Sequence, residues 1–275
     1  MLQRTKRLSG AAIIVAAALV VQTARADLVL SAPPRETPEA GLKLYGPLAE
    51  FLSKAIGEKV EYRHPDNWGI YQGLMTKGEY DLVFDGPHFV SWRIQRLKHE
   101  PLAALSGKLG FVVVAQQDDS QVRAVKDLAG KKVCGHAPPN LATLTLFDQF
   151  SNPSRQPRLF ETKGFDGAYQ GLLAGKCVGT VLPLEAHKKL EGAIARTRVL
   201  HTSEMYTNQA LTAGPRVSAA VRQKIAQAML EAQVKMASRQ IAATFGGSEF
   251  VAVTKADYAG YDGLLKNTWG FEQRQ

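Results

Sequence analysis

Hydrophobic and polar positions along this chain follow two alternating patterns. Short continuous apolar runs indicate buried strands, and the segments between them repeat apolar residues every three or four positions, as amphipathic helices do. The first of these helices carries Leu44, Leu48 and Leu52 on one face and ends at Gly57. The strands predicted in this way are 28–30, 59–63, 82–84, 111–115, 132–136, 158–161 and 177–183, and the helices include 140–150, 165–174 and 184–191.

This alternation of strand and helix predicts an α/β fold built on mostly parallel sheets. The pattern restarts near residue 111 with the same rhythm, and no Ser/Gly-rich linker separates the two halves. We therefore expect two lobes joined by segments that cross a hinge near 107–111 and 202–213. Lobe 1 is predicted to comprise residues 27–108 and 205–275, and lobe 2 residues 109–204.

The C-terminal part of the chain shows a longer helical pattern. Val217, Val221, Ile225 and Met229 share one face, which predicts a single long helix from about residue 215 to 245. A short closing helix is expected at 255–265, with Trp269 as an apolar plug behind it.

The first residues have the composition of a secretory signal. Three basic residues among the first seven precede an apolar run from Gly10 to Val21, which is too short to cross a bilayer. The small-x-small pattern at 24–26 predicts cleavage after Ala26 and export to the periplasm, with Asp27 as the first mature residue. The alternative is an apolar anchor that stays attached to the membrane.

The charge balance favours an anionic partner but no nucleic acid. Removing residues 1–26 takes away four basic residues and no acidic one, which leaves 30 basic and 25 acidic residues and lowers the net charge from +9 to +5. The basic residues are scattered along the chain, whereas nucleic-acid binding requires them in a patch or stripe. With 45% apolar and 21% charged residues, the composition is that of an ordinary globular protein. We expect a monomer.

Neither the cysteines nor the histidines are arranged for metal or redox chemistry. Cys134 and Cys177 form no C-x-x-C motif, and an even number of cysteines in an exported protein favours one disulfide. The six histidines show no ligand spacing, so no metal or cofactor is expected. No nucleophile-elbow motif is present. The enzyme alternative would need Asp85 and His88 as an acid–base pair.

One connection between a strand and a helix stands out as a candidate anion site. The strand at 132–136 ends in Pro138 and Pro139, and Asn140 can cap the helix that follows, with Thr143 on its first turn. The first turn of a helix presents unpaired N–H groups and the positive end of the helix dipole. The alternative is an ordinary connection of an α/β sheet.

Further candidate ligand residues follow the ends of predicted strands. Arg35 can clamp an oxyanion or carboxylate with its guanidinium, or be a solvated surface residue. Asp85 can select an amine or hydroxyl, and His88 an anion, or the two can simply begin the next helix. Glu185, which follows the strand at 177–183, has the same two interpretations as Asp85.

Three aromatic or imidazole side chains complete the predicted ligand set. Tyr45 can close over a ligand or pack within its lobe, and Trp68 can stack on a ligand or belong to the core or rim. His136 lies at the end of its strand, where it either contacts the ligand or packs among its neighbours.

Four segments in order resemble the phosphate-, phosphonate- and phosphite-type periplasmic solute-binding proteins of ABC transporters. They are 45–52 (YGPLAEFL), 73–87 (GLMTKGEYDLVFDGP), 125–133 (VKDLAGKKV) and 171–178 (GLLAGKCV). The resemblance implies a two-lobed type II periplasmic-binding-protein fold with a hinge and a ligand cleft between the lobes. In that fold the strands that carry Cys134 and Cys177 are neighbours, about 5 Å apart. It therefore implies a disulfide between these two cysteines.

The chain departs from the family pattern where the family carries its Ser/Thr-rich cluster. The corresponding segment 138–143 reads PPNLAT, so Asn140 and Thr143 are its only polar side chains, and the family's histidine near the next helix start is replaced by 164–166 (GFD). A singly charged oxyanion or small carboxylate fits this donor set better than a dianionic phosphate. We expect an exported solute-binding protein that delivers a small anion to an ABC permease. The alternatives are signalling to a membrane sensor kinase and, from a different class, a periplasmic enzyme.

Overall fold

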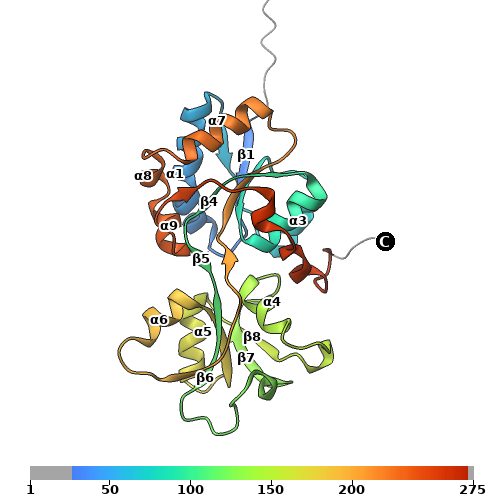
Figure 1. Cartoon of the computed structure of the whole chain (residues 1–275), viewed down its shortest axis with the longest axis vertical. Helices are drawn as coiled ribbons and strands as arrows, with labels where there is room; N and C mark the ends of the chain where they lie inside the picture. Colours follow the sequence, from blue (N-terminus) through green and yellow to red (C-terminus); the bar gives the residue numbers. More distant parts are fainter. Residues whose placement is uncertain (1–26, 272–275) are drawn as a thin grey trace, which may run out of the picture.

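A computed structural model describes residues 27–271 and shows two α/β lobes stacked along the long axis of the molecule (Figure 1). The predicted signal segment and its cleavage site lie outside the described residues. Within 27–271, no helix combines the length and the apolar character needed to span a bilayer.

A six-stranded sheet forms the first lobe, with strand order β13-β4-β12-β3-β1-β2. β1 pairs in parallel with β2 and β3, and β12 runs antiparallel to β3 and β4. The mixed sheet thus contains four strands from before the second lobe and two from after it. Its strands are β1 (Leu28–Ser31), β2 (Val60–Tyr62), β3 (Leu82–Asp85), β4 (Glu100–Leu105), β12 (Ala210–Ala213) and β13 (Phe250–Val251).

Helices cover both faces of this sheet. Thr37 caps the first of them, and Gly57 ends it in the left-handed conformation with φ 73°, where a residue without Cβ is unstrained. The apolar face of this helix packs on the strands in one core cluster with Leu30 and Phe84. The helices of the first lobe are α1 (Pro38–Ile56), α2 (Trp68–Thr76), α3 (Pro87–Leu97), α7 (Ala219–Met229), α8 (Val234–Ala237) and α9 (Arg239–Phe245).

The expected single helix at about 215–245 is wrong, because the segment folds as α7, α8 and α9. Val221, Ile225 and Met229 are buried as predicted, but the chain turns after Met229 and places Met236 87% exposed. Ser238 then interrupts the remainder, since its hydroxyl donates to the carbonyl of Val234 and its φ of −107° is not helical. The apolar pattern of the sequence continues through the turn after Met229 and through Ser238, so it did not reveal these two helix ends.

The second lobe contains a five-stranded sheet with order β10-β6-β9-β7-β8. β7 is parallel to both β8 and β9, and β6 is antiparallel to β9 and β10. The strands are β6 (Phe111–Gln116), β7 (Lys132–Gly135), β8 (Arg158–Glu161), β9 (Gly179–Pro183) and β10 (Thr197–Thr202), and the helices are α4 (Leu141–Phe147), α5 (Gly164–Leu173) and α6 (Leu184–Glu191).

The disulfide predicted between Cys134 and Cys177 is confirmed. The two Cα atoms lie 5.7 Å apart, and both residues belong to a buried cluster with Tyr169 and Leu172 of α5. The bond therefore fixes the start of β9 to β7 beneath α5, inside the second lobe.

Two short strands carry the chain between the lobes. β5 (Lys108–Leu109) and β11 (Tyr206–Thr207) pair antiparallel as a separate two-stranded ribbon. They lie in the segments predicted to cross the hinge, and Figure 1 shows them between the two sheets.

The C-terminal segment contacts both lobes. Instead of one helix it forms two 3-10 turns, Lys255–Tyr258 and Tyr261–Leu265, because Gly260 adopts a left-handed φ of 83° between them. Leu265 packs with the first lobe, whereas Leu264 packs against the core of the second. The segment thus ties the lobes together beside α4.

Candidate ligand-binding cleft

A cavity of about 490 Å³ lies between the lobes, where the carboxyl ends of the strands of both sheets meet. In open α/β sheets, this edge is where ligands bind. The segments directly after β1, β3, β7 and β9 all reach the cavity, which places side chains from both lobes on its wall. The polar lining residues are Arg35, Glu36, His88, Lys108, His136, Asn140, Glu185, Lys189, Gln209 and Thr244, and the aromatic ones are Trp68, Phe89, Phe111, Phe165 and Phe245.

Three helices begin at this cavity without a side-chain cap. These are α3, α5 and α6, whose preceding residues are Gly86, Lys163 and Pro183. Away from the cavity, Thr37 caps α1 and Ser218 caps α7 through a hydroxyl that accepts a backbone N–H. Uncapped first turns leave backbone donors and positive dipole ends facing the cleft, which favours an anion there.

Arg35 is the dominant charge in the cleft. Its guanidinium carbon lies 5.2 Å from the centre of the Phe245 ring, and its positive charge acts on Glu36, His88 and His136. Burial lowers the pKa of both histidines, and the nearby guanidinium lowers them further, so both rings are neutral at neutral pH. Burial raises the pKa of Glu36, and Arg35 offsets part of that rise.

His88 links the two lobes directly across the cleft. Its Nε2 lies 3.0 Å from the carbonyl oxygen of Pro139, which belongs to the second lobe. The ring is 1% exposed and packs on Phe89, with 4.1 Å between the ring centres. The structure therefore shows the lobes in contact, with a histidine from lobe 1 bound to the turn before α4.

Buried polar atoms without a hydrogen-bond partner are concentrated in the cleft. Among the described residues there are nine such side-chain atoms, and five belong to residues that line this cavity. Each buried unpaired polar group costs about 1–3 kcal/mol, so native proteins keep few of them. The five are Arg35 Nη1, Glu36 Oε2, His88 Nδ1, His136 Nδ1 and Gln209 Oε1. A polar molecule held between the lobes would supply the missing partners.

Comparison with known proteins identifies the family. A sequence profile described as "ABC transporter, phosphonate, periplasmic substrate-binding protein" matches residues 30–258, which is most of the chain. The chain belongs to this family. It is therefore a substrate-binding protein of the ABC-transporter type and not an enzyme.

One relative is the "Phosphate-import protein PhnD" of Mycolicibacterium smegmatis, 33% identical over 115 residues. That match covers 39% of this chain and 36% of the relative, so the chain spans little more than a third of that protein's length.

Solved structures of similar fold confirm the two-lobed architecture predicted for the binding protein. PhnD1 of Prochlorococcus marinus, in complex with methylphosphonate, matches with a TM-score of 0.67 and 14% identity over 87% of this chain and 97% of its own. XAC2383 of Xanthomonas citri, bound to ATP, matches with a TM-score of 0.69 and 11% identity over 90% of this chain and 97% of its own. At such identities the likeness extends to the fold alone.

Six of the residues predicted as ligand contacts line the cleft of this binding protein. Four of them follow the ends of β1, β3, β7 and β9, and the other two lie at the starts of α2 and α4. They are Arg35, Trp68, His88, His136, Asn140 and Glu185. Asn140 is 8% exposed, and its side chain accepts the N–H of Ala142, so it caps α4 as predicted. Glu185 is exposed and pairs with Lys188 at 2.7 Å.

The other three predicted contacts are not among the lining residues. Tyr45 is fully buried in the core of the first lobe, 5.1 Å from the ring of Tyr62. Thr143 donates its hydroxyl to the carbonyl of His136, which holds the turn before α4 in place. Asp85 is also fully buried.

Asp85 belongs to a buried ionic network inside the first lobe. Its Oδ2 accepts hydrogen bonds from the hydroxyl of Tyr71 at 2.6 Å and from Nε of Arg93 at 3.1 Å. Arg93 and Asp85 are both 0% exposed, and Arg93 also bonds the Tyr71 hydroxyl. Burial is the largest influence on the pKa of Asp85 and raises it, while the guanidinium acts in the opposite direction. This network anchors α3, which carries His88, to β3.

Several cleft residues were not predicted from the sequence, and Glu36, Gln209 and Phe245 are among them. Glu36 follows Arg35 directly, and this pair of opposite charges after a strand was a usable signal. Gln209 and Phe245 gave none, because the first belongs to the chain's return through the hinge and the second ends α9.

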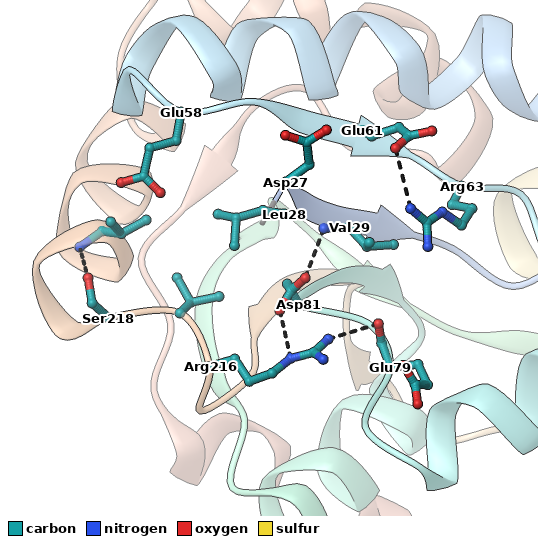
Figure 2. A pocket seen from close by; sticks show the side chains of 12 residues that line it. Asp27, Leu28, Val29, Glu58, Glu61, Arg63, Glu79, Asp81, Arg216 and Ser218 are labelled. Atoms are coloured by element: carbon teal, nitrogen blue, oxygen red, sulfur yellow. Dashed lines mark hydrogen bonds and ion pairs between the residues drawn. The ribbon is translucent and has the colours of Figure 1, made fainter. Parts of the chain in front are cut away.

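A second cavity, of about 510 Å³, lies at the opposite edge of the first sheet near the amino ends of β1 and β3 (Figure 2). Its charged groups are largely paired with one another. Asp81 accepts the N–H of Val29 and the Nε of Arg216, and Glu61 pairs with Arg63. Among the described residues, none of the nine unpartnered buried atoms belongs to the lining of this cavity, so no buried polar group there requires a ligand as its partner.

Proposed function

We infer that this protein captures a small oxyanion in the interlobe cleft and delivers it to an ABC permease. The observation that carries this proposal is the group of five buried, unpartnered polar atoms on the cleft wall. Arg35 and the uncapped starts of α3, α5 and α6 favour negative charge in the same place.

The relatives support this choice of ligand. The family is one of phosphonate-type periplasmic binding proteins, and one structure of similar fold holds methylphosphonate. Export through the predicted signal at 1–26 would bring the mature protein to the compartment where such proteins work. The contacts between the lobes then give a mechanism for capture, because a ligand that bridges both walls stabilises the closed form.

A ligand screen by thermal shift and titration calorimetry tests the proposal. The mature chain 27–275 is mixed with methylphosphonate, phosphate, phosphite, sulfate, acetate, neutral sugars and basic amino acids. At a concentration one hundred times the Kd, the true ligand stabilises the fold by about 2.7 kcal/mol. For a chain of this size, that raises Tm by roughly 5–10 °C. Stabilisation by an oxyanion alone supports the proposal, and stabilisation by only sugars or basic amino acids would refute it.

Delivery to a permease requires a separate measurement in cells. Uptake of the radiolabelled ligand by the source organism should fall when the gene is deleted and return when it is restored. Unchanged uptake in the deletion strain, with the protein binding the same ligand in vitro, would contradict the transport role.

A further inference from the structure

The unpartnered atoms of the cleft are mostly hydrogen-bond acceptors. Glu36 contributes a carboxylate oxygen and Gln209, only 5% exposed, contributes an amide oxygen, whereas Arg35 contributes the one guanidinium donor among the five. A carboxylate oxygen and an amide oxygen accept hydrogen bonds and cannot donate them. An anion without hydrogen atoms would satisfy Arg35 and leave these oxygens unpaired.

His88 adds a third acceptor. A carbonyl oxygen can only accept, so the contact of 3.0 Å between Nε2 and the oxygen of Pro139 requires the ring proton to be on Nε2. Burial among apolar side chains keeps the ring neutral. In a neutral imidazole with a proton on Nε2, Nδ1 carries a lone pair, and this atom is buried without a partner.

Nδ1 of His88 and the guanidinium of Arg35 both lie close to Gly86 on the cleft wall. A Cβ atom added to Gly86, on the cleft wall, would lie 3.1 Å from His88 Nδ1 and 4.0 Å from Arg35 Nη2, so these nitrogens are at most 7.1 Å apart. Hydrogen bonds of roughly 2.8 Å from two oxygens of one tetrahedral group can span such a separation. One oxygen would accept from Arg35, while another would have to donate to His88.

We propose that the cleft selects anions that also donate a hydrogen bond, and that Glu36, His88 and Gln209 are the residues that detect the donor. The inference rests on the anion-binding function proposed above. The donor can be a proton retained on the oxyanion itself, or a hydroxyl or ammonium group on its organic part. A site built to hydrogen-bond a donor rejects an analogue that lacks it, because its own buried groups are then left unpaired.

Matched pairs of probes separate charge from donor capacity. At mildly acidic pH, methylphosphonate and methanesulfonate are tetrahedral monoanions of nearly the same shape, but only the phosphonate keeps a proton. Taurine and ethanesulfonate differ instead in an ammonium group on the organic part. We expect methylphosphonate to bind at least about tenfold tighter than methanesulfonate, or taurine tighter than ethanesulfonate by the same factor, as one hydrogen bond to a desolvated partner implies. Whichever pair shows the preference identifies the source of the donor.

Substitutions at Glu36 test which residues detect the donor. Glu36 is only partly buried, so the fold should tolerate Glu36→Met, which removes the acceptor, and Glu36→Gln, which keeps an acceptor oxygen without the charge. For the probe pair that shows the preference, the Kd of the probe without the donor divided by the Kd of the probe with it should fall severalfold in Glu36→Met. The same ratio should be retained in Glu36→Gln. Gln209→Met provides an uncharged second test, and Gln227→Met on the exposed face of α7 is its control.

The outcomes distinguish this inference from the function on which it rests. If methanesulfonate and ethanesulfonate bind as tightly as their donor-bearing counterparts, the donor requirement is wrong and the anion-binding function stands. If both Glu36 variants and Gln209→Met keep the full preference, these residues do not detect the donor. If no oxyanion binds while a neutral or cationic solute does, the function and the inference fall together.

Discussion

Replacing Arg35 with methionine should abolish ligand binding while leaving the fold nearly intact. Arg35 is only partly buried, its Nη1 has no partner, and its positive charge lowers the pKa of the neighbouring Glu36 and His88. Methionine has a similar reach and no charge, so the substitution removes the electrostatic contact without opening a large void.

The magnitude follows from the contacts that Arg35 can make. Hydrogen bonds to charged groups contribute about 1.5–3 kcal/mol each, and a guanidinium can make two to one oxyanion. A loss of about 3–4 kcal/mol raises Kd roughly 100- to 1,000-fold. In the unliganded protein, Arg35 contacts the Phe245 ring, which is worth about 0.5–1 kcal/mol, and interacts with Glu36 and Tyr45 beside it. The Tm of the empty protein should therefore change by less than about 4 °C.

Calorimetric titration of the oxyanion found in the screen measures the first effect, and calorimetric unfolding measures the second. Arg63→Met is a matched control, because Arg63 is an exposed arginine of the same lobe that pairs with Glu61 outside the cleft. If Arg35→Met binds the oxyanion within threefold of the unmodified protein, Arg35 is not a main ligand contact. If the Tm of the empty variant falls by more than about 10 °C, Arg35 is a structural residue.

Three further predictions concern stability. Arg93→Met should lower the unfolding free energy by about 3–5 kcal/mol in urea titrations, since it leaves a buried carboxylate uncompensated, and a loss below 1 kcal/mol would contradict the role given to this network. Replacing both Cys134 and Cys177 by serine should cost up to about 4 kcal/mol in the same assay, and free thiols detected in the unreduced, denatured protein would argue against the bond. Burial lowers the pKa of His88 and of His99 to about 3, so between roughly pH 6.5 and 3 the unfolded chain binds more protons than the folded one. The contribution of these histidines to the unfolding free energy should be complete above pH 6.5 and decrease on acidification through that window. His88→Gln should reduce the slope of unfolding free energy against pH. An unchanged slope would show that His88 does not contribute.

Much of the fold followed from local patterns in the sequence. Strand and helix alternation depends on whether consecutive residues meet a core or solvent, so the parallel strands of both lobes and the helices between them were readable from the apolar periods. The strands β4, β10, β12 and β13 were not predicted. Gly57 ended α1 as expected because a left-handed residue there needs no Cβ. The disulfide was predictable once the order of strands in the second lobe was assumed. The long helix at 215–245 was wrong because its apolar period continued through breaks set by a turn and by Ser238.

The ligand site was only partly predictable, because a position at the end of a strand does not specify where its side chain points. Asp85 is the last residue of β3 and His88 lies three residues later, yet Asp85 turns into the lobe toward Arg93 and Tyr71, and His88 reaches across to Pro139. That division depends on which partners the helix α3 brings to the sheet, and no local pattern contains this information.

The tertiary structure alone decided which groups the cleft leaves unsatisfied. Gln209 reaches the cavity because the chain returns through the hinge, more than one hundred residues after His88. Glu36 and Arg35 are adjacent in sequence, but the sequence does not show that their unpaired atoms lie in the same cleft as the unpaired Nδ1 of His88. The sequence by itself determined the parallel strands, the helices between them and the resemblance to the family. The balance of donors and acceptors in the cleft arises from burial and from contacts between lobes, and these exist only once the carboxyl ends of the two sheets are brought together.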